Sequence, residues 1–317
     1  MAGSANNQEI RKRLSEYTPG STRYLVGHGY SRVCVQLFGM TGHGKSSLIN
    51  SCMCVIYDKE FENMANAGKS NNPITMERRE FKLQRNVCIS DNRGVNKLTK
   101  DEYHEVTAQL CKLRSASEVN WENGLEHAIN RFLERLNNPP TEIIVPVLVC
   151  SATWFLNDET VEQILPFLTE TKEITGIFPI IVLTKYKNTE IQAQQTLRIF
   201  ENRGANHVIG IENYTTTDSR RNLEKDTNIL KFVEICLQEA DRIIFLKQGK
   251  SPLEDFLMHA VKHIRAISER EIEKKDKEIE DLEKKMNKQK ASVAKEMKIN
   301  VNLKKELAEL KTKMGKP

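Results

Sequence analysis

The fold is decided by Arg32-Val-Cys-Val-Gln-Leu-Phe38 and the segment that follows it, Gly39-Met-Thr-Gly-His-Gly44-Lys45-Ser46. The second segment fits G-x-x-x-x-G-K-[ST], a glycine-rich loop between a strand and a helix. The apolar run before it predicts the strand, and Ser47–Val55 predicts the helix. In such a loop the backbone N–H groups point inward at a helix N-terminus and form an anion cradle. We therefore expect this loop to bind phosphate.

The side chains of the loop have separate expected roles. Lys45 is expected to reach the β- and γ-phosphates of a nucleoside triphosphate, and the Ser46 hydroxyl to ligate Mg²⁺. The other loop residues expected to contact the nucleotide are Gly39, Thr41, Gly42, His43, Gly44 and Ser47.

Residues 32–247 alternate short apolar runs with longer helical patterns. The expected strands are Val33–Phe38, Glu80–Leu83, Val87–Ser90, Ile143–Cys150, Pro179–Leu183 and His207–Ile211. The expected helices are Lys45–Tyr57, Glu102–Leu113, Trp121–Leu136, Asp158–Thr171, Glu190–Arg203 and Asp226–Leu246. The alternation predicts an α/β fold, a P-loop NTPase of the Ras-like G-domain class, with a mostly parallel sheet flanked by helices. Ligands of such a sheet lie at the carboxyl ends of its strands. Residues 1–31 read as a polar N-terminal arm.

A second strand ends in acidic and glycine residues, Val87-Cys-Ile-Ser-Asp91-Asn-Arg-Gly94. This pattern is typical of the segment in switch GTPases that senses Mg²⁺ and the γ-phosphate, with Asp91 holding the metal through water and the Gly94 amide contacting the phosphate. Between the two motifs, the polar loop 68–75 offers Thr75, with Ser70 as a rival, to close over the metal. The expected metal ligands are Ser46, Thr75 and Asp91, and the expected catalytic set is Lys45, Thr75, Asp91 and Gly94.

Base recognition is expected at the end of a later strand. In GTPases, Asn/Thr-Lys-x-Asp stands there, and this chain has Thr184-Lys185-Tyr-Lys187. Thr184 and Lys185 match, but a lysine at 187 cannot accept hydrogen bonds from guanine N1 and N2. Guanine preference is therefore open at this point. Asn213 and Tyr214, after the next strand, are expected to contact the base from that side.

Hydrolysis is expected to be slow. Val95 follows Gly94, where small GTPases carry the glutamine that orients the attacking water. An apolar side chain cannot hold that water. Arg93 could add positive charge, although an arginine in such a loop is more often solvated.

Several of these residues together resemble the GTPase domain of the interferon-induced protein 44 family. The resemblance covers Phe38–Ser47, the loop 67–75, Asp91–Gly94, and Ile211-Glu-Asn-Tyr with Asp226-x-x-Ile-Leu. It implies a G domain that binds GTP or GDP with Mg²⁺, with a role in innate immune responses. Immunity-associated GTPases and septins share the same core motifs, and septins also carry a C-terminal coiled coil.

The C-terminal segment, residues 251–317, predicts one long helix. Its apolar residues follow a heptad in which six of the seven a positions are apolar. The a positions are Ile272, Ile279, Met286, Val293, Asn300, Leu307 and Met314, and the d positions are Lys275, Leu282, Gln289, Glu296, Leu303 and Leu310. This is a coiled-coil pattern, so we expect a homo-oligomer through residues 253–314. The flanking charges favour an antiparallel pairing over a parallel one.

The composition narrows the other possibilities. The net charge of +5 does not by itself indicate a nucleic-acid partner, although the lysine-rich C-terminus could contact nucleic acid or an anionic membrane. The seven cysteines form no C-x-x-C pair, and the N-terminus lacks the apolar region of a signal peptide. We therefore expect reduced thiols and a cytoplasmic protein.

Three functions are open at this stage. The first is a nucleotide switch that hydrolyses GTP slowly and is coupled to oligomerisation. The second is a nucleotide-bound scaffold with little or no turnover. The third is an ATP-preferring P-loop protein.

Overall fold

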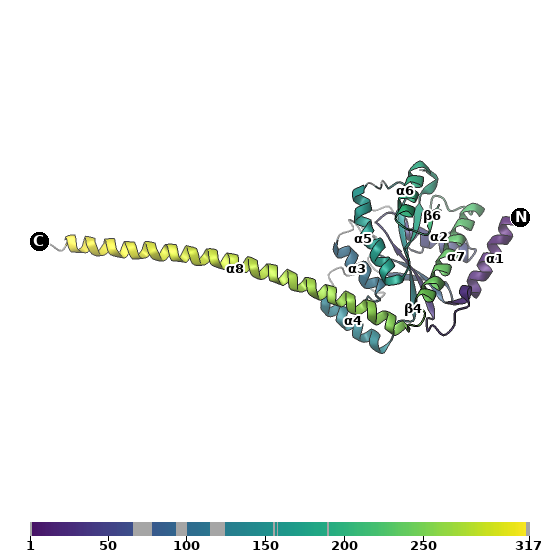
Figure 1. Cartoon of the computed structure of the whole chain (residues 1–317). Helices are drawn as coiled ribbons and strands as arrows, with labels where there is room; N and C mark the ends of the chain where they lie inside the picture. Colours follow the sequence, from purple (N-terminus) through teal and green to yellow (C-terminus); the bar gives the residue numbers. More distant parts are fainter. Residues whose placement is uncertain are drawn as a thin grey trace. The chain divides into compact units, whose positions relative to one another are not determined.

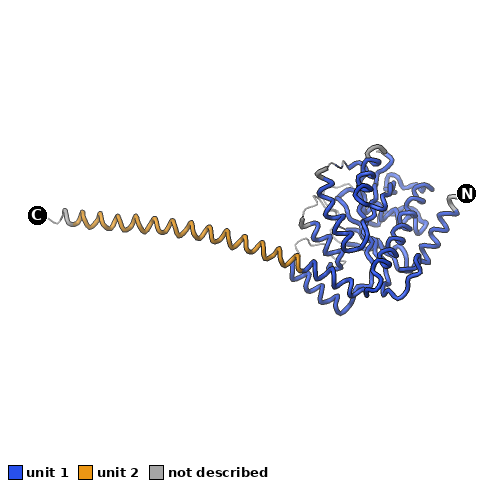
Figure 2. The backbone as a smooth tube through the Cα atoms, in the orientation of Figure 1, with its two compact units in different colours: residues 1–264 blue, residues 265–317 orange. Residues whose placement is uncertain are grey.

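The computed structural model describes residues 2–65, 78–92, 100–114, 124–154, 156, 158–188 and 190–314. It divides the chain into two units, residues 1–264 and 265–317 (Figure 2). The expected residues Thr75, Ser70, Arg93, Gly94 and Val95 lie outside the described residues.

The first unit is an α/β domain built on a six-stranded sheet (Figure 1). Its strands are β1 (Arg32–Phe38), β2 (Arg79–Gln84), β3 (Val87–Asp91), β4 (Glu142–Ser151), β5 (Ile180–Thr184) and β6 (Val208–Ile211). The spatial order is β2-β3-β1-β4-β5-β6. β2 runs antiparallel to β3 and every other pair is parallel. The expectation of a mostly parallel sheet flanked by helices is confirmed.

The helices lie close to their expected positions. They are α1 (Ala2–Glu16), α2 (Lys45–Ile56), α3 (Lys100–Leu110), α4 (Leu125–Asn137), α5 (Asp158–Thr175), α6 (Glu190–Asn202), α7 (Leu223–Leu246) and α8 (Pro252–Met314). Two short 3-10 helices, η1 (Ser21–Arg23) and η2 (Tyr186–Asn188), complete the described elements.

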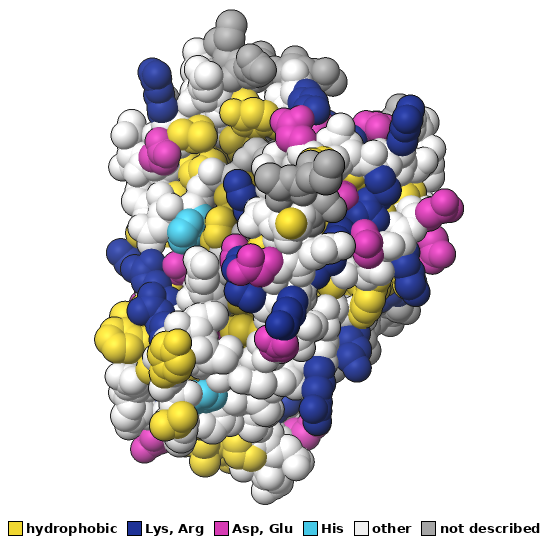
Figure 3. Space-filling view, turned by 90° about the vertical axis from the view of Figure 1, so that its right-hand side faces the viewer, with side chains coloured by type: hydrophobic (Ala, Val, Ile, Leu, Met, Phe, Trp, Pro, Cys, Tyr) yellow, Lys and Arg dark blue, Asp and Glu magenta, His cyan; other side chains and the backbone are white. Residues whose placement is uncertain are grey.

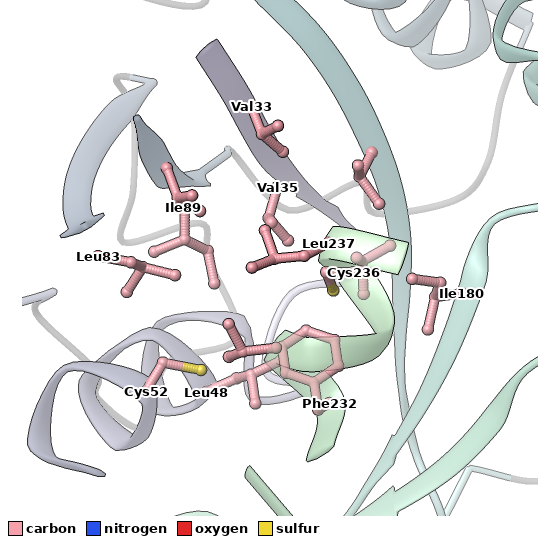
Figure 4. Packing of buried hydrophobic residues seen from close by; sticks show 14 of the residues in the cluster. Val33, Val35, Leu48, Cys52, Leu83, Ile89, Ile180, Phe232, Cys236 and Leu237 are labelled. Carbon is pink, nitrogen blue, oxygen red and sulfur yellow. The ribbon is translucent and has the colours of Figure 1, made fainter. Parts of the chain in front are cut away.

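Alternate residues of the central strands pack into two separate cores. Val145, Val147 and Val149 of β4 face the core formed with α1, α2 and α7. Leu148 and Cys150 of the same strand face the core formed with α3, α5, α6 and the start of α8. This is the two-residue period of a strand that is covered on both faces. Figure 4 shows the first core, where side chains of α2 and α7 meet those of β1 and β3.

The N-terminal segment differs from the polar arm expected for it. Residues 2–16 form α1, and Ile10 and Leu14 are buried in the first core. The residues that follow α1 in the sequence are bound to the buried carboxylate of Asp241 in α7. This carboxylate accepts hydrogen bonds from the Tyr17 hydroxyl and from the backbone amides of Gly20 and Thr22, at 2.6–2.7 Å. With so few apolar residues in this segment, its periodicity is too weak to predict a packed helix.

Helix α8 begins within the first unit. The Ser251 hydroxyl accepts from the Glu254 amide, and the Glu254 carboxylate accepts from the Ser251 amide, at 3.2 and 2.7 Å. This reciprocal arrangement is a capping box, and Pro252 stands at the first helical position, where its missing N–H costs nothing. Phe256 and Ala260 are buried in the second core. The first turns of α8 therefore belong to the globular unit.

From Arg265 onward the helix forms the second unit, whose apolar residues are exposed. Ile272, Ile279, Leu282 and Leu310 are each more than half exposed. Leu253, Phe256 and Ile264 pack in the first unit, whereas Met258 and Val261 are about half exposed. The expected oligomer contact through residues 253–314 stays a prediction.

Candidate nucleotide-binding site

The glycine loop, residues 39–46, connects the carboxyl end of β1 to α2. Gly39, Gly42 and Gly44 adopt positive φ angles of 139°, 79° and 92°. A Cβ at Gly39 would lie 2.2 Å from the Val149 carbonyl oxygen of β4. Glycine is therefore required at this point both for the backbone conformation and for the close approach to the sheet.

The start of α2 presents backbone donors beside this loop. The first bond of the helix runs from the Leu48 amide to the Gly44 carbonyl at 2.9 Å. The N–H groups of residues 45–47 precede that bond and have no carbonyl within the helix to pair with. Together with the helix dipole, they make a place where an anion is stabilised.

Lys45 adds a buried positive charge at this place. Its ammonium donates to the Gly39 and Met40 carbonyls at 2.9 and 3.0 Å, and the residue is 6% exposed. Burial lowers the pKa of the Lys45 ammonium to about 8, and the Asp91 carboxylate opposes that shift. A negatively charged phosphate beside Lys45 would also raise the pKa of its ammonium, against the effect of burial.

Ser46 and Asp91, expected as metal ligands, are brought together. The Ser46 hydroxyl donates to Asp91 Oδ2 at 2.8 Å. Asp91 is the last residue of β3 and is 2% exposed. The next residue is Asn92. Its side-chain amide donates to the Leu37 carbonyl at 3.0 Å and links the end of β3 to β1. A hydroxyl and a carboxylate that lie within hydrogen-bond distance of each other offer the hard oxygen ligands that suit Mg²⁺.

Thr184 and Lys185 reach the glycine loop from the end of β5. The Thr184 hydroxyl donates to the His43 carbonyl at 2.7 Å, and the Lys185 ammonium donates to the Gly42 carbonyl at 3.2 Å. Lys185 has a φ of 59°, which is uncommon for a residue with a side chain and is a form of strain found at functional sites.

Asn213 and Tyr214, both expected to contact the base, have different positions. The side-chain amide of Asn213 donates to the Gly44 carbonyl at 3.2 Å. Tyr214 is fully buried, its amide donates to the Ser51 hydroxyl, and its own hydroxyl donates to Asp226 of α7 at 2.8 Å. The Tyr214 side chain therefore packs between α2 and α7, and its expected contact with a base stays a prediction.

His43 lies in the loop with its ring turned inward. The ring meets Trp154 edge-on, with 4.9 Å between centroids. Burial lowers the pKa of the His43 imidazole to about 4, with a further contribution from the Lys45 charge. The ring is therefore neutral at physiological pH and adds no charge to the loop.

A small, partly open apolar pocket lies beside the loop, and the sequence does not predict it. Its lining includes Phe38, Met40, His43, Tyr103, Trp154 and Phe167. These walls offer little to bind a phosphate, so the candidate anion site is the N–H face of the loop. Trp154, shortly after the end of β4, is the one sequence signal that could have indicated an aromatic wall here.

Glu212, directly after β6, was not singled out from the sequence. Its Oε1 accepts a hydrogen bond from the Lys187 amide at 3.3 Å. The Lys187 ammonium lies 3.4 Å from Glu224 Oε2, and both side chains are more than half exposed. The residue at the base-reading position therefore pairs with the start of α7.

No protein-family model matches the chain, and a search of curated proteins finds no match for it. The family resemblance drawn from the motifs therefore stays a prediction. None of the described helices is both long and apolar enough to cross a membrane.

Proposed function

We propose that this protein binds a nucleoside triphosphate with Mg²⁺ at the glycine loop. The observation that carries the proposal is the arrangement of Lys45, Ser46 and Asp91 at one edge of the sheet, with Ser46 and Asp91 hydrogen-bonded at 2.8 Å. A buried ammonium, free helix N-terminal amides and two oxygen ligands together match the charge of a triphosphate and its metal.

Each group has a part in this proposal. The amides of residues 45–47 and the Lys45 ammonium would hold the phosphates, while Ser46 and Asp91 would hold a metal ion, which would supply positive charge against the phosphates. Thr184, Lys185 and Asn213 hold the loop carbonyls from the side where the base would lie. The fold is then that of a P-loop NTPase with a Ras-like G domain.

The protein would act as a slow nucleotide switch. Asp91 ends β3, and Gly94 and Val95 follow it closely in the sequence, which supports a switch segment next to the metal ligand. Val95 supports slow hydrolysis, since it cannot orient water. The motif resemblance to the interferon-induced protein 44 family supports a proposed role for this switch in innate immune responses. A nucleotide-bound scaffold without turnover is the second candidate, and Val95 also favours it.

Binding and turnover are tested with one variant. We expect Lys45→Ala to weaken binding of fluorescent triphosphate with Mg²⁺ by about 100-fold or more, because a buried charged contact is lost. Lys231→Ala, at an exposed lysine of α7, is the matched control and should bind as the wild type does. Equal binding by all three proteins would show that the loop is not the nucleotide site. Phosphate release by the wild type then separates a switch from a scaffold.

We also propose that the second unit pairs with a second copy of itself, antiparallel, about a centre between residues 294 and 295. In this register Leu282 faces Leu307 of the partner subunit, and Met286 faces the partner's Leu303. These side chains are about half exposed or more in the single chain. Burying them contributes roughly 25 cal/mol for each Å² of apolar surface.

Charge selects the orientation of this pairing. Residues 269–283 hold eight acids and four bases, whereas residues 284–316 hold eleven lysines and three glutamates. Antiparallel pairing opposes Asp276 to the partner's Lys311, and Lys285 to the partner's Glu306. Parallel pairing instead opposes Glu278 to the partner's Glu283, and Lys285 to the partner's Lys290. Unlike charges at these positions determine the direction of pairing and the choice of partner, and they add little to the stability of the pair.

A charge exchange tests the direction. Asp276→Lys should weaken self-association measured by sedimentation, and the double variant Asp276→Lys with Lys311→Asp should restore it. In a parallel pair Asp276 faces the partner's Glu271, so Asp276→Lys would strengthen association, which is the contrary outcome.

An anionic membrane or nucleic acid remains the less favoured partner. On the face drawn in Figure 3, Lys and Arg side chains are interspersed with Asp and Glu. A mixed face of this kind does not produce the single-sign field that attracts a polyanion, whereas residues 284–316, with eleven lysines and three glutamates, carry the charge that would.

A further inference from the structure

The position that should carry the base-reading carboxylate carries Lys187. Its ammonium reaches toward Glu224 at the start of α7, at 3.4 Å, and its side chain is 52% exposed. The side chain is therefore directed to the surface of the unit. At the proposed base site, Lys187 therefore contributes only its backbone amide.

The Glu212 carboxylate lies against that amide. Glu212 directly follows β6, whose last residue, Ile211, is the register partner of Thr184 in β5. Its Oε1 accepts from the Lys187 amide at 3.3 Å. A carboxylate from β6 is thus held beside the backbone position from which an aspartate would otherwise extend.

The neighbours of Glu212 place it at the base end of the site. Asn213, the next residue, donates to the Gly44 carbonyl, and Thr184 and Lys185 donate to the carbonyls of His43 and Gly42. Glu212 therefore stands next to Asn213, which contacts the glycine loop, and it is hydrogen-bonded to the segment after β5, which contacts the loop as well. The Lys185 stem runs from this place to the loop, so its methylene groups offer an apolar edge for a flat ring.

The Glu212 side chain keeps acceptor capacity for a ligand. It is half-buried, and within the part of the chain that the structure describes its single hydrogen bond is the one to the Lys187 amide. An ionised carboxylate has about four lone-pair positions, so one such bond leaves most of them available.

We propose that Glu212 is the residue that reads the base and that it selects guanine. Guanine presents two adjacent donors, N1–H and the 2-amino group, which match the two oxygens of a carboxylate. Adenine presents the lone pair of N1 beside its amino group, and that lone pair would face the carboxylate. This inference rests on the proposed nucleotide site and names the substrate class of that site.

The alternative is that Glu212 only holds the turn at η2. In that case its replacement would change stability and leave base selectivity as it is. Selectivity is therefore the readout that separates the two roles.

The test is a panel of triphosphates bound to the full-length protein with Mg²⁺. The wild type should bind GTP at least about tenfold more tightly than ATP, the size of one lost charged hydrogen bond. Glu212→Gln should lower GTP affinity about tenfold and raise that of XTP, since xanthine carries an oxygen where guanine has its 2-amino group and so accepts from the glutamine amide. Lys187→Ala, which keeps the backbone amide, should retain the wild-type preference.

Four results would overturn the inference. Equal binding of GTP and ATP by the wild type, or an unchanged GTP-to-XTP ratio in Glu212→Gln, would overturn it while the nucleotide site stands. Absence of all triphosphate binding would overturn both proposals together. If Glu212→Gln does not fold, the wild type alone decides, because ITP lacks the 2-amino group and should bind more weakly than GTP. Equal binding of ITP and GTP then removes the two-donor reading.

Discussion

Leu230 of the globular unit is fully buried, whereas Leu282 of the second unit is 63% exposed. Both leucines belong to helices with an apolar stripe, α7 and α8. The stripe of α7 is covered by β1, β4 and α2 of the same chain, so its burial is complete within one molecule. Most large apolar side chains of residues 265–314 are exposed in the single chain. In the oligomer proposed above they would be buried against a second molecule, so the same kind of side chain would stabilise a domain in one unit and an assembly in the other.

The largest expected effect is the loss of a buried leucine. Leu230→Ala should lower the free energy of unfolding of the globular unit by about 2–5 kcal/mol, because it leaves a cavity in the first core. Urea unfolding followed by tryptophan fluorescence measures this change. Leu282→Ala, the same chemical change in the second unit, should leave that transition unchanged. A matching loss in both variants would mean that the two units share one folding transition.

Leu282→Ala should instead weaken self-association. Each leucine that becomes buried is worth about 1.5–3 kcal/mol, so the dissociation constant should rise about tenfold or more. Sedimentation equilibrium measures it, with Lys277→Ala as a control outside the apolar stripe. If both variants associate as the wild type does, another surface holds the assembly.

A smaller effect is expected at the cap of α7. The Asn222 side chain accepts from the Glu224 and Lys225 amides at 2.9 and 3.2 Å. Asn222→Ala should cost about 1 kcal/mol of the free energy of unfolding, and Asn222→Asp should restore most of it. Thermal unfolding followed by circular dichroism checks both. An alanine variant as stable as the wild type would show that tertiary packing alone determines where α7 begins.

The smallest effect is expected on the exposed surface of α8. The Lys284 ammonium pairs with Glu280 at 2.7 Å, one helical turn away. Lys284→Ala should reduce the stability of the second unit by about 0.3–0.5 kcal/mol at low salt. The difference should vanish at about 1 M salt, where the Debye length is near 3 Å. A difference that persists at high salt would indicate that the methylene stem, rather than the charge, contributes.

Much of the fold could be predicted because its signals are local. The strands of the sheet are short apolar runs, and the glycine loop is defined by its spacing. The ends of the helices were harder to predict. α7 begins at Leu223 rather than Asp226, because Asn222 caps it, and α1 was missed because its buried face has few apolar residues.

The candidate site was predicted unevenly for a related reason. Lys45, Ser46 and Asp91 belong to motifs whose spacing follows from chemistry, and they meet as expected. Tyr214 was assigned to the ligand, yet its burial depends on α2 and α7, which lie far from it in sequence. Glu212 belongs to the segment Ile211-Glu-Asn-Tyr, but its place beside Lys187 exists only once β5 and β6 are paired.

The sequence by itself determined the phosphate loop, the strand that ends in Asp91 and the heptad of the C-terminal helix. Each is a periodic or fixed-spacing pattern in which backbone geometry relates neighbours along the chain. Only the tertiary structure decided that Tyr214 is buried between α2 and α7, that Glu212 accepts a hydrogen bond from the Lys187 amide, and that α8 packs on the domain as far as Ile264. Those facts depend on which distant segments come into contact, and burial and charge pairing are properties of that contact.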